Sequence, residues 1–337
     1  MENYEIKSTA TARGIIATKA IESGEFIFSD SPLFVAQYSI NRSFFPACPV
    51  CMAPIQHVNK YIQKMLSIDT EYEQFMNVVS CESCSQQYCT LEHKEQDRTH
   101  KAFCNNTLYN ELISWWSTVH QVPEWTTPEL ILKIAFQLVI DGTFDTNDST
   151  VNHFIHCLPN LEDEMHLIEH LTNQHSDIYF QKISDAFEEG CRLLGISIEF
   201  SYTQFKDIIL ACALNGQGVG TSPLDSLRIL NDFEDEQLET LASKLLIEYP
   251  NNAFTHCEGT ALYKTHAMLN HSCIPNAHCQ FTNLDENDLQ NGTIEIIAIQ
   301  DINKGDEICI SYNESDQKAN YNYEMYRFHC KCTLCLK

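Results

Sequence analysis

The pattern of apolar and polar residues predicts strands at both ends of the chain and helices between them. Residues 1–46 hold three short apolar runs, and Gly24 and Pro32 interrupt them in the manner of turns between short strands. Similar runs return near the C-terminus. The expected strands cover residues 14–17, 25–28, 33–35, 294–298 and 307–312.

Two of these strand regions repeat one pattern. Residues 17–27 and 298–308 both show apolar alternation that surrounds a glycine turn, and an acidic residue follows each glycine. Because the two copies lie at opposite ends of the chain, we expect one β-fold assembled from both halves, with the middle of the sequence inserted.

The middle of the chain, residues 105–250, shows helical spacing. Thr127-Pro128-Glu129 supplies a cap, a first-turn proline and an early acidic residue before apolar positions at helical intervals. The same spacing predicts helices in residues 161–171, 183–194 and 238–246, with a loop at 145–149.

One motif in this helical region resembles a catalytic site. His166-Leu167-Ile168-Glu169-His170 matches the H-x-x-E-H pattern of inverted zinc metalloproteases. No third ligand is identifiable, and two histidines with one glutamate are common on a solvated acidic helix. We therefore interpret this segment as a helix surface.

Composition narrows the classes of function. The 337 residues carry a formal charge of −25, and the basic residues form no run that could follow a phosphate backbone. Direct nucleic-acid binding is not expected. An acidic enzyme would attract basic partners such as lysine-rich protein tails, although the charge could also serve solubility alone.

No targeting or membrane segment is expected. The first five residues lack the basic and apolar regions of a signal peptide, and the best apolar run, 130–140, is broken by Lys133 and Gln137. We expect a cytoplasmic and nuclear protein, and a monomer. Sixteen cysteines in such a reducing compartment indicate metal ligands or buried thiols rather than disulfides.

Eight cysteines and histidines lie in tandem pairs that suit two tetrahedral zinc ions. Their order resembles a MYND finger, a protein-interaction module. His93 stands where that family usually has cysteine, and the gap from Cys51 to Cys81 is longer than usual. An interleaved pairing assigns Cys48, Cys51, Cys89 and His93 to one ion and Cys81, Cys84, His100 and Cys104 to the other.

Three more cysteines, Cys330, Cys332 and Cys335, lie close together near the C-terminus, and Cys273 is the candidate for a fourth ligand. Cys273 belongs to the segment Asn270-His271-Ser272-Cys273-Ile274-Pro275-Asn276, which follows an apolar run. We interpret Asn270 and His271 as lining a cofactor pocket; a polar turn after a buried strand is the alternative. The cysteines at 157, 191, 212, 257, 279 and 309 are interpreted as buried thiols.

A glycine-rich segment, Asn215-Gly216-Gln217-Gly218-Val219-Gly220, precedes the C-terminal strands. It is not a P-loop, because no Gly-Lys-Ser/Thr follows it. The glycines could let the backbone approach a ligand, with Asn215 offering an amide. A plain glycine-rich turn explains the local sequence equally well.

Taken together, these pieces resemble the SET and MYND domain lysine methyltransferases, in the family's order and over nearly the whole chain. The pieces are Arg13-Gly14-Ile15, the double zinc finger, Asn215, residues 270–276, residues 305–308 with Tyr312, and Phe328 with the last three cysteines. Residues 215–222 and 257–259 look most like the branch of SET and MYND domain-containing protein 5.

The resemblance implies an α+β fold in which a split, mainly β SET domain contains a MYND zinc finger and a helical insert, and ends in a zinc-binding post-SET tail. The implied divisions are the N-terminal part of the SET domain (1–46), the finger (47–104), the helical insertion (105–213), the C-terminal SET core (214–313) and the post-SET segment (314–337).

The resemblance also implies a reaction, methyl transfer from S-adenosyl-L-methionine to a lysine ε-amine, with three structural Zn²⁺ ions. A free lysine has a pKa of ~10.4, and an apolar channel lowers that pKa by disfavouring the charged form. Tyr312 would orient the amine without acting as a strong base, and Tyr326 and Phe328 would complete the channel. The implied cofactor-binding residues are Thr11, Ala12, Arg13, Gly14, Asn215, Asn270, His271, Tyr312 and Phe328, with Ala12 replacing a usual glycine.

Two hypotheses from different classes follow. The first is a protein-lysine methyltransferase that acts on basic proteins, such as histone tails and ribosomal proteins. The second is a non-catalytic zinc scaffold whose finger binds proline-rich peptides. In the second case Tyr312 would be an ordinary strand-end tyrosine with a satisfied hydroxyl group.

Overall fold

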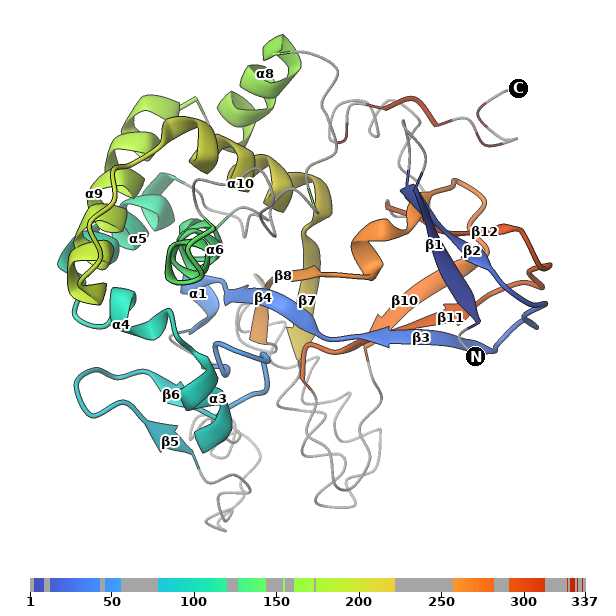
Figure 1. The fold of residues 1–337 in the computed structure, drawn as a ribbon, viewed down its shortest axis with the longest axis horizontal. Helices are drawn as coiled ribbons and strands as arrows, with labels where there is room; N and C mark the ends of the chain where they lie inside the picture. The colour runs from blue at the N-terminus through green and yellow to red at the C-terminus, as the bar shows by residue number, and fades with distance from the viewer. Residues whose placement is uncertain are drawn as a thin grey trace, which may run out of the picture.

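The structure is a computed structural model, in which helices occupy one side and strands the other, with the finger beneath the helices (Figure 1). Thr11, Ala12 and the expected helix 238–246 lie outside the described residues. The structure describes residues 3–8, 13–42, 46–55, 78–119, 127–143, 154, 161–172, 174–221, 257–281, 291–312, 326, 328–330, 332 and 335.

One sheet joins the two ends of the chain. Its central strands run antiparallel, and Ile15 of one faces Ile308 of the other in a fully buried pair. The short edge strand that contains Asn270 runs parallel to its neighbour. The strand order is β1 (Tyr4–Ser8), β2 (Arg13–Ala17), β12 (Glu307–Ile310) and β9 (Asn270–His271).

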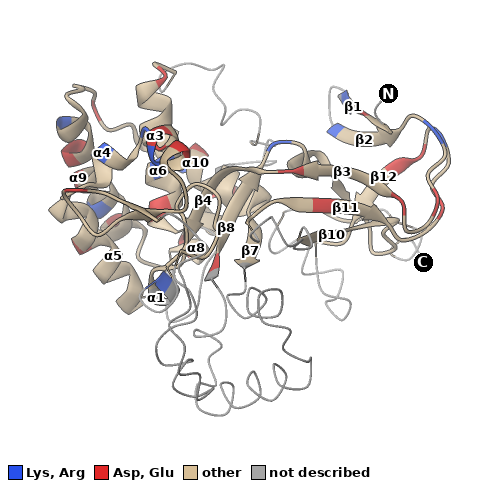
Figure 2. Cartoon of the chain, turned by 90° about the horizontal axis from the view of Figure 1, so that it is seen from below, with Lys and Arg blue, Asp and Glu red and all other residues tan. Residues whose placement is uncertain are grey.

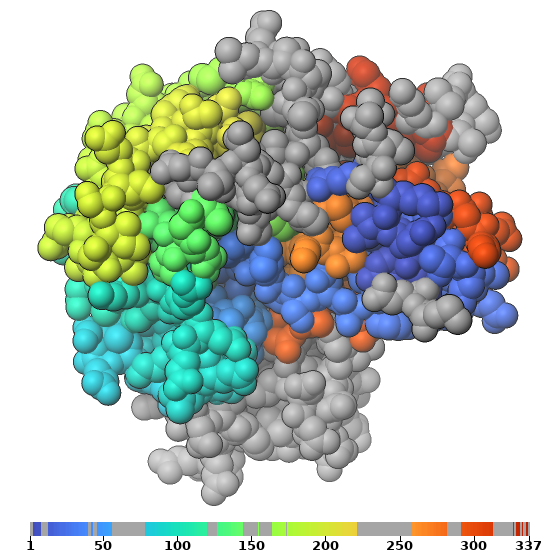
Figure 3. All heavy atoms as spheres, in the orientation of Figure 1, coloured from blue at the N-terminus to red at the C-terminus, as the bar shows by residue number. Residues whose placement is uncertain are grey.

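The repeated pattern explains how the two ends meet. Ile21 and Ile302 lie at equivalent places in the two copies and exchange both backbone hydrogen bonds, each at 2.9 Å. Both glycines of the pattern, Gly24 and Gly305, have left-handed φ angles of 85° and 93° that favour glycine. The expectation that both halves form one β-fold is confirmed, and their surfaces are continuous in Figure 3.

A second sheet packs its apolar face against the first. Its strands are β10 (Ala277–Phe281), β11 (Ile294–Ala298) and β3 (Phe26–Asp30), in that order. Alternate residues of β11 are buried, which is the period expected of a half-buried strand. The shared core includes Ile15, Ile27, Leu269, Ile296 and Ile310.

A third sheet connects the strands with the helices and contains β4 (Pro32–Gln37), β8 (Cys257–Tyr263) and β7 (Gln217–Thr221). The glycine-rich segment forms β7, so its interpretation as a turn is wrong. Gly259 permits the close pairing of β8 with β4, because a side chain there would lie 2.3 Å from the Ala36 carbonyl oxygen.

The helices pack around α6 (Pro128–Ile140), which is buried along nearly its whole length. Thr127 caps it, because its hydroxyl accepts a hydrogen bond from the Leu130 N–H. The helix predicted at 161–171 has these bounds, whereas the one predicted at 183–194 begins earlier. The remaining helices here are α1 (Ser39–Arg42), α5 (Thr107–Val119), α8 (Leu161–Leu171), α9 (Ser176–Leu194) and α10 (Tyr202–Asn215).

The finger is joined to this helical layer by a buried lysine. The ammonium group of Lys133 on α6 donates to the carbonyl oxygens of Val35 at 3.0 Å and Pro49 at 2.6 Å. One side chain therefore links a helix, β4 and the first zinc-ligand loop. The finger itself contains β5 (Val79–Ser80), β6 (Gln87–Tyr88), α3 (Leu91–Gln96) and α4 (His100–Phe103).

The observed architecture confirms the predicted α+β class. None of the helices in the described part of the chain is long and apolar enough to cross a membrane. Acidic residues occur on the helices and on strands β3, β11 and β12, whereas Lys and Arg are scattered along the chain (Figure 2).

Candidate active site and metal centres

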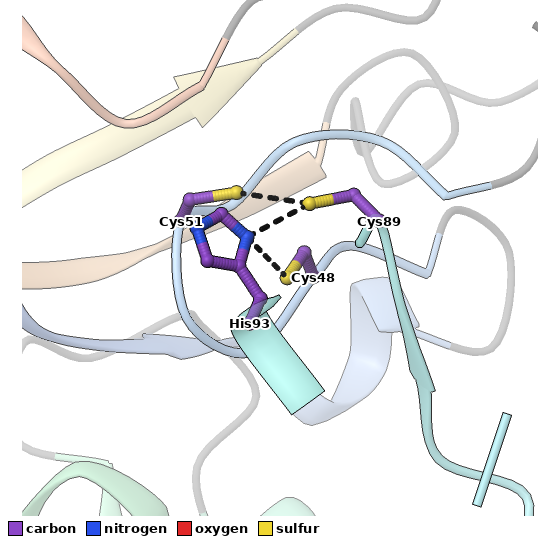
Figure 4. A group of neighbouring side chains, drawn as sticks. All are labelled: Cys48, Cys51, Cys89 and His93. Atoms are coloured by element: carbon purple, nitrogen blue, oxygen red, sulfur yellow. Dashed lines mark hydrogen bonds between the residues drawn. The ribbon is translucent and has the colours of Figure 1, made fainter. Parts of the chain in front are cut away.

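The first finger cluster joins two loops and a helix (Figure 4). The side chains of Cys48, Cys51, Cys89 and His93 point toward one another, and their ligand atoms all lie within 4.8 Å of one another. Thr90 positions His93, because its hydroxyl caps α3 by accepting from the His93 N–H at 3.1 Å. The grouping is the interleaved one that the spacing favours.

The second finger cluster contains Cys81, Cys84, His100 and Cys104. Asp97 positions His100, because its carboxylate accepts a hydrogen bond from the His100 backbone N–H at 3.1 Å. The N–H of Ser83 donates to the Cys81 sulfur, and this hydrogen bond is the main reason that the pKa of Cys81 falls to about 6. A lowered thiol pKa favours the thiolate, the form that binds zinc.

A third cluster brings the C-terminal tail onto the β-core. The Cys273 sulfur lies 3.7 Å from that of Cys330 and 3.5 Å from that of Cys335, and Cys332 completes the group. Tetrahedral zinc with Zn–S bonds of ~2.3 Å separates its sulfur ligands by about 3.8 Å. The three clusters therefore have the ligand types and spacing of closed structural zinc sites.

The other cysteines described lie outside these clusters. Burial is the main cause that raises the pKa of Cys191, Cys279 and Cys309 to about 12, and it also raises that of Cys212. Cys191 and Cys212 are buried as expected, whereas Cys279 and Cys309 are only partly buried. Among the described residues, no metal cluster includes the histidines of the H-x-x-E-H segment on α8.

Tyr312 follows β12 and lies among aromatic rings from the tail. Its ring centroid is 5.1 Å from that of Tyr326 and 6.2 Å from that of Phe328. Its hydroxyl donates a hydrogen bond of 2.5 Å to the Leu269 carbonyl oxygen. Burial raises the pKa of Tyr312, so the phenol stays neutral at neutral pH and its oxygen lone pairs can meet a substrate.

His271 links Tyr312 to the third cluster. Its Nδ1 accepts from the Tyr312 backbone N–H at 3.0 Å, and its Nε2 lies 3.3 Å from the Cys273 sulfur. Because Nδ1 accepts, the neutral ring carries its proton on Nε2, which points it toward the sulfur. Burial lowers the pKa of His271, which keeps the ring neutral.

Asn270 joins three segments from different parts of the chain. Its amide nitrogen donates to the Arg13 carbonyl oxygen and to Glu307 Oε1, both at 2.6 Å. Gly14 lets this carboxylate approach the backbone closely, because a Cβ there would lie 2.6 Å from Glu307 Oε1 and would displace that side chain. Glu307 was not among the predicted site residues, although it belongs to the repeated glycine-acid pattern.

A cavity of about 280 Å³ lies beside Tyr312 and Tyr326. Its other lining residues come from the end of α10, the start of β7, the segment before Asn270 and the end of β12; they include Asn215, His266, Leu269 and Ile310. Of the predicted cofactor and channel residues in the described part, Arg13, Gly14, Asn270, His271 and Phe328 are not in the lining of this cavity. His271 and Phe328 contact the Tyr312 ring instead.

Asn215, predicted to offer an amide to a ligand, lines this cavity. Its Nδ2 donates to the carbonyl oxygens of Phe154 at 2.7 Å and Ala211 at 2.9 Å, so both amide hydrogens are used within the chain. Only its side-chain oxygen is left for a ligand. Sequence reasoning also missed His266, a polar residue in the otherwise apolar stretch before Asn270.

The fold and the site define the class to which the chain belongs. The model of the SET domain family matches residues 12–313. This match spans both strand-forming ends as well as the inserted finger and helices. The chain belongs to the SET domain family.

The similarity to individual relatives is more specific. The chain is 27% identical over 357 residues to protein-lysine N-trimethyltransferase SMYD5 of Mus musculus, which covers 96% of this chain and 84% of the relative. The human SMYD5 is 27% identical over 364 residues, covering 98% and 85%. Histone-lysine N-methyltransferase ATXR2 of Arabidopsis thaliana is 30% identical over 159 residues, covering 45% and 32%. These similarities confirm the resemblance that the motifs carry, including the SMYD5 branch.

Proposed function

We propose that this chain is a protein-lysine N-methyltransferase that uses S-adenosyl-L-methionine. Membership of the SET domain family and the names of the SMYD5 relatives support methyl transfer to lysine. The observation that carries the proposal is the position of Tyr312. Its hydroxyl proton is held by the Leu269 carbonyl, at the wall of a cavity large enough for a lysine side-chain end.

The cavity suits a lysine that must lose its proton before it reacts. Leu269, Ile310 and Tyr326 supply apolar surface to its wall beside Tyr312. Such walls disfavour the ammonium form and lower the pKa of the amine. The neutral Tyr312 hydroxyl is a poor base, so it orients the amine. Positioning of this kind can supply roughly 7–11 kcal/mol of a reaction barrier.

The residues around His271 and Asn270 fit the cofactor. It supplies an electrophilic methyl group on a sulfonium ion, and aromatic faces attract cations. The Phe328 ring lies 5.8 Å from that of His271, and the neighbouring Asn270 holds the backbone of Arg13 through its carbonyl oxygen. Arg13, Gly14, Asn270, His271 and Phe328 would therefore hold the cofactor.

The charge of −25 supports basic proteins as substrates, because it attracts lysine-rich segments over a long range. Histone tails and ribosomal proteins both have this chemistry, and they are found in the nucleus and the cytoplasm. The relatives are named N-trimethyltransferases. The number of methyl groups added by this chain depends on the cavity that receives the amine.

A second candidate function has one observation in its favour. A cavity of about 620 Å³ lies between the finger and α5, where Pro46, Phe103 and Ile113 offer apolar contacts. A finger with such a neighbouring cavity could bind proline-rich peptides without any catalysis. In that case the SET portion would serve as a scaffold.

Transfer of a tritiated methyl group to core histones and to a ribosomal extract separates the two functions. We expect the wild-type chain to label a basic protein, Tyr312→Phe to lose the label, and the matched variant Tyr202→Phe to retain it. Tyr202 is exposed at the start of α10 and away from the cavity. If no protein is labelled while a proline-rich peptide binds the finger, the scaffold function is correct.

A further inference from the structure

His266 is a buried histidine whose ring nitrogens make no hydrogen bond to the residues that the structure describes. It lies in the 3₁₀ turn η1 (His266–Met268), and 7% of its surface is exposed. Neither ring nitrogen makes a hydrogen bond within the described part of the chain. The ring of Tyr263 makes an edge contact with it at 5.8 Å.

The backbone of this turn is held firmly, in contrast to the unpaired ring. One carboxylate oxygen of Asp30 accepts from the N–H groups of Thr265 at 2.6 Å and His266 at 2.9 Å. That carboxylate is thus used by the backbone and does not pair with the imidazole. The backbone of His266 is therefore held in place, while its ring nitrogens make no hydrogen bond within the described part of the chain.

An unpaired buried polar ring destabilises a protein, and such a group in a native fold calls for an explanation. His266 lines the same cavity as Tyr312 and Tyr326. Rotation about χ2, which is soft in histidine, can turn a ring nitrogen toward the cavity. Burial lowers the pKa of His266 to about 4, so at neutral pH one nitrogen donates a hydrogen bond and the other accepts one.

We propose that His266 contacts the ε-amine of the target lysine and selects its methylation state, an inference that rests on the proposed methyltransferase function. A neutral amine directs its lone pair at the methyl carbon, and its N–H groups then need acceptors. The unprotonated nitrogen of His266 can accept one of them. A neutral dimethylated amine has no N–H, so it gains nothing from His266.

The reaction itself needs no proton transfer to His266. The C–N bond forms from the amine lone pair while the C–S bond breaks, and the sulfur keeps that electron pair. The methylammonium product then loses a proton to solvent before another transfer. His266 acts by hydrogen bonding to substrates that retain an N–H, which favours the first two transfers over the third.

The test compares three forms of one peptide. The peptide surrounds the lysine that the wild-type chain labels in the transfer assay, and it is synthesised unmethylated, monomethylated and dimethylated. Loss of one hydrogen bond in His266→Leu should lower kcat/KM for the unmethylated peptide about tenfold relative to the dimethylated one. His266→Gln keeps a donor and an acceptor and should recover part of the preference.

A measurement of thermal stability shows whether a change in kcat/KM comes from misfolding of the His266 variant. Because His266→Leu removes an unpaired buried ring, its Tm should rise by about 2 °C or more, whereas a structural role would lower it. An equal change in kcat/KM for all three peptides, in both variants, would overturn the role of His266 and leave the methyltransferase function intact. A wild-type chain that transfers no methyl group would overturn both.

Discussion

The C-terminal zinc cluster is expected to control the active site as well as the stability of the tail. The perturbation that tests this linkage is Cys332→Ser, which removes one of four ligands. Phe328 and Tyr326 precede the tail cysteines of the cluster and contact the rings of His271 and Tyr312. We expect the variant to lose cofactor affinity together with one zinc ion.

The magnitude follows from the contacts of the tail. Three ring pairs join it to the core, with centroids at 5.1, 5.8 and 6.2 Å, and pairs of this kind contribute about 0.5–1.5 kcal/mol each. Ordering even six residues costs about 6–12 kcal/mol of backbone entropy. The ring contacts alone do not offset this cost, whereas a structural zinc site contributes about 10–16 kcal/mol.

The assay combines zinc content by elemental mass spectrometry with cofactor binding by calorimetry. Cys332→Ser should hold two zinc ions instead of three and bind S-adenosylmethionine at least tenfold more weakly. The matched control is Cys191→Ala, which removes a buried thiol of α9 outside every cluster. It should keep three ions and full affinity. Cofactor affinity within twofold of wild type in a two-zinc Cys332→Ser protein would refute the linkage.

Three further changes test other parts of the account. Tyr312→Phe should lower kcat about 100-fold or more in a transfer assay. Cofactor affinity measured by calorimetry should change little, because the hydroxyl orients only the amine. A kcat within threefold of wild type would count against the role of Tyr312. Lys133→Met removes the ammonium donor to the carbonyls of Val35 and Pro49 and should lower the free energy of unfolding by about 2–4 kcal/mol in urea denaturation. An unchanged midpoint would show that this ammonium does not join the finger to the helices. The pKa of His266 falls from 6.5 to about 4 on folding, so between these values the unfolded chain binds more protons and stability falls as the pH falls. The free energy of unfolding should fall by about 3 kcal/mol at pH 4. Urea titrations at a series of pH values should show a smaller fall for His266→Leu than for the wild type. Identical pH dependence in the two proteins would contradict the burial of a neutral ring.

Local chemistry explains why several elements could be predicted. Thr127 and Pro128 define the start of α6 through a cap and a fixed φ angle, so residues close in sequence are sufficient. The tandem Cys and His pairs of the finger are similarly local. The repeated glycine-acid pattern predicted the joining of the two chain ends, because each copy carries the same turn chemistry.

Distant contacts explain what the sequence did not reveal. The amide of Asn215 is used by the carbonyl of Phe154, 61 positions away, and no local pattern reports that contact. Strand β1 forms only by pairing with β2, and its exposed Ile6 gives no clear alternation. His266 stands out only when the cavity and the absence of ring partners among the described residues are known.

The most direct test of the central claim is mass spectrometry of a basic protein mixture after reaction with S-adenosylmethionine that carries a deuterated methyl group. The account predicts heavy methyl groups on lysine ε-amines with the wild-type chain and none above background with Tyr312→Phe. A folded wild-type protein with three zinc ions and bound cofactor that leaves every lysine unlabelled would contradict it.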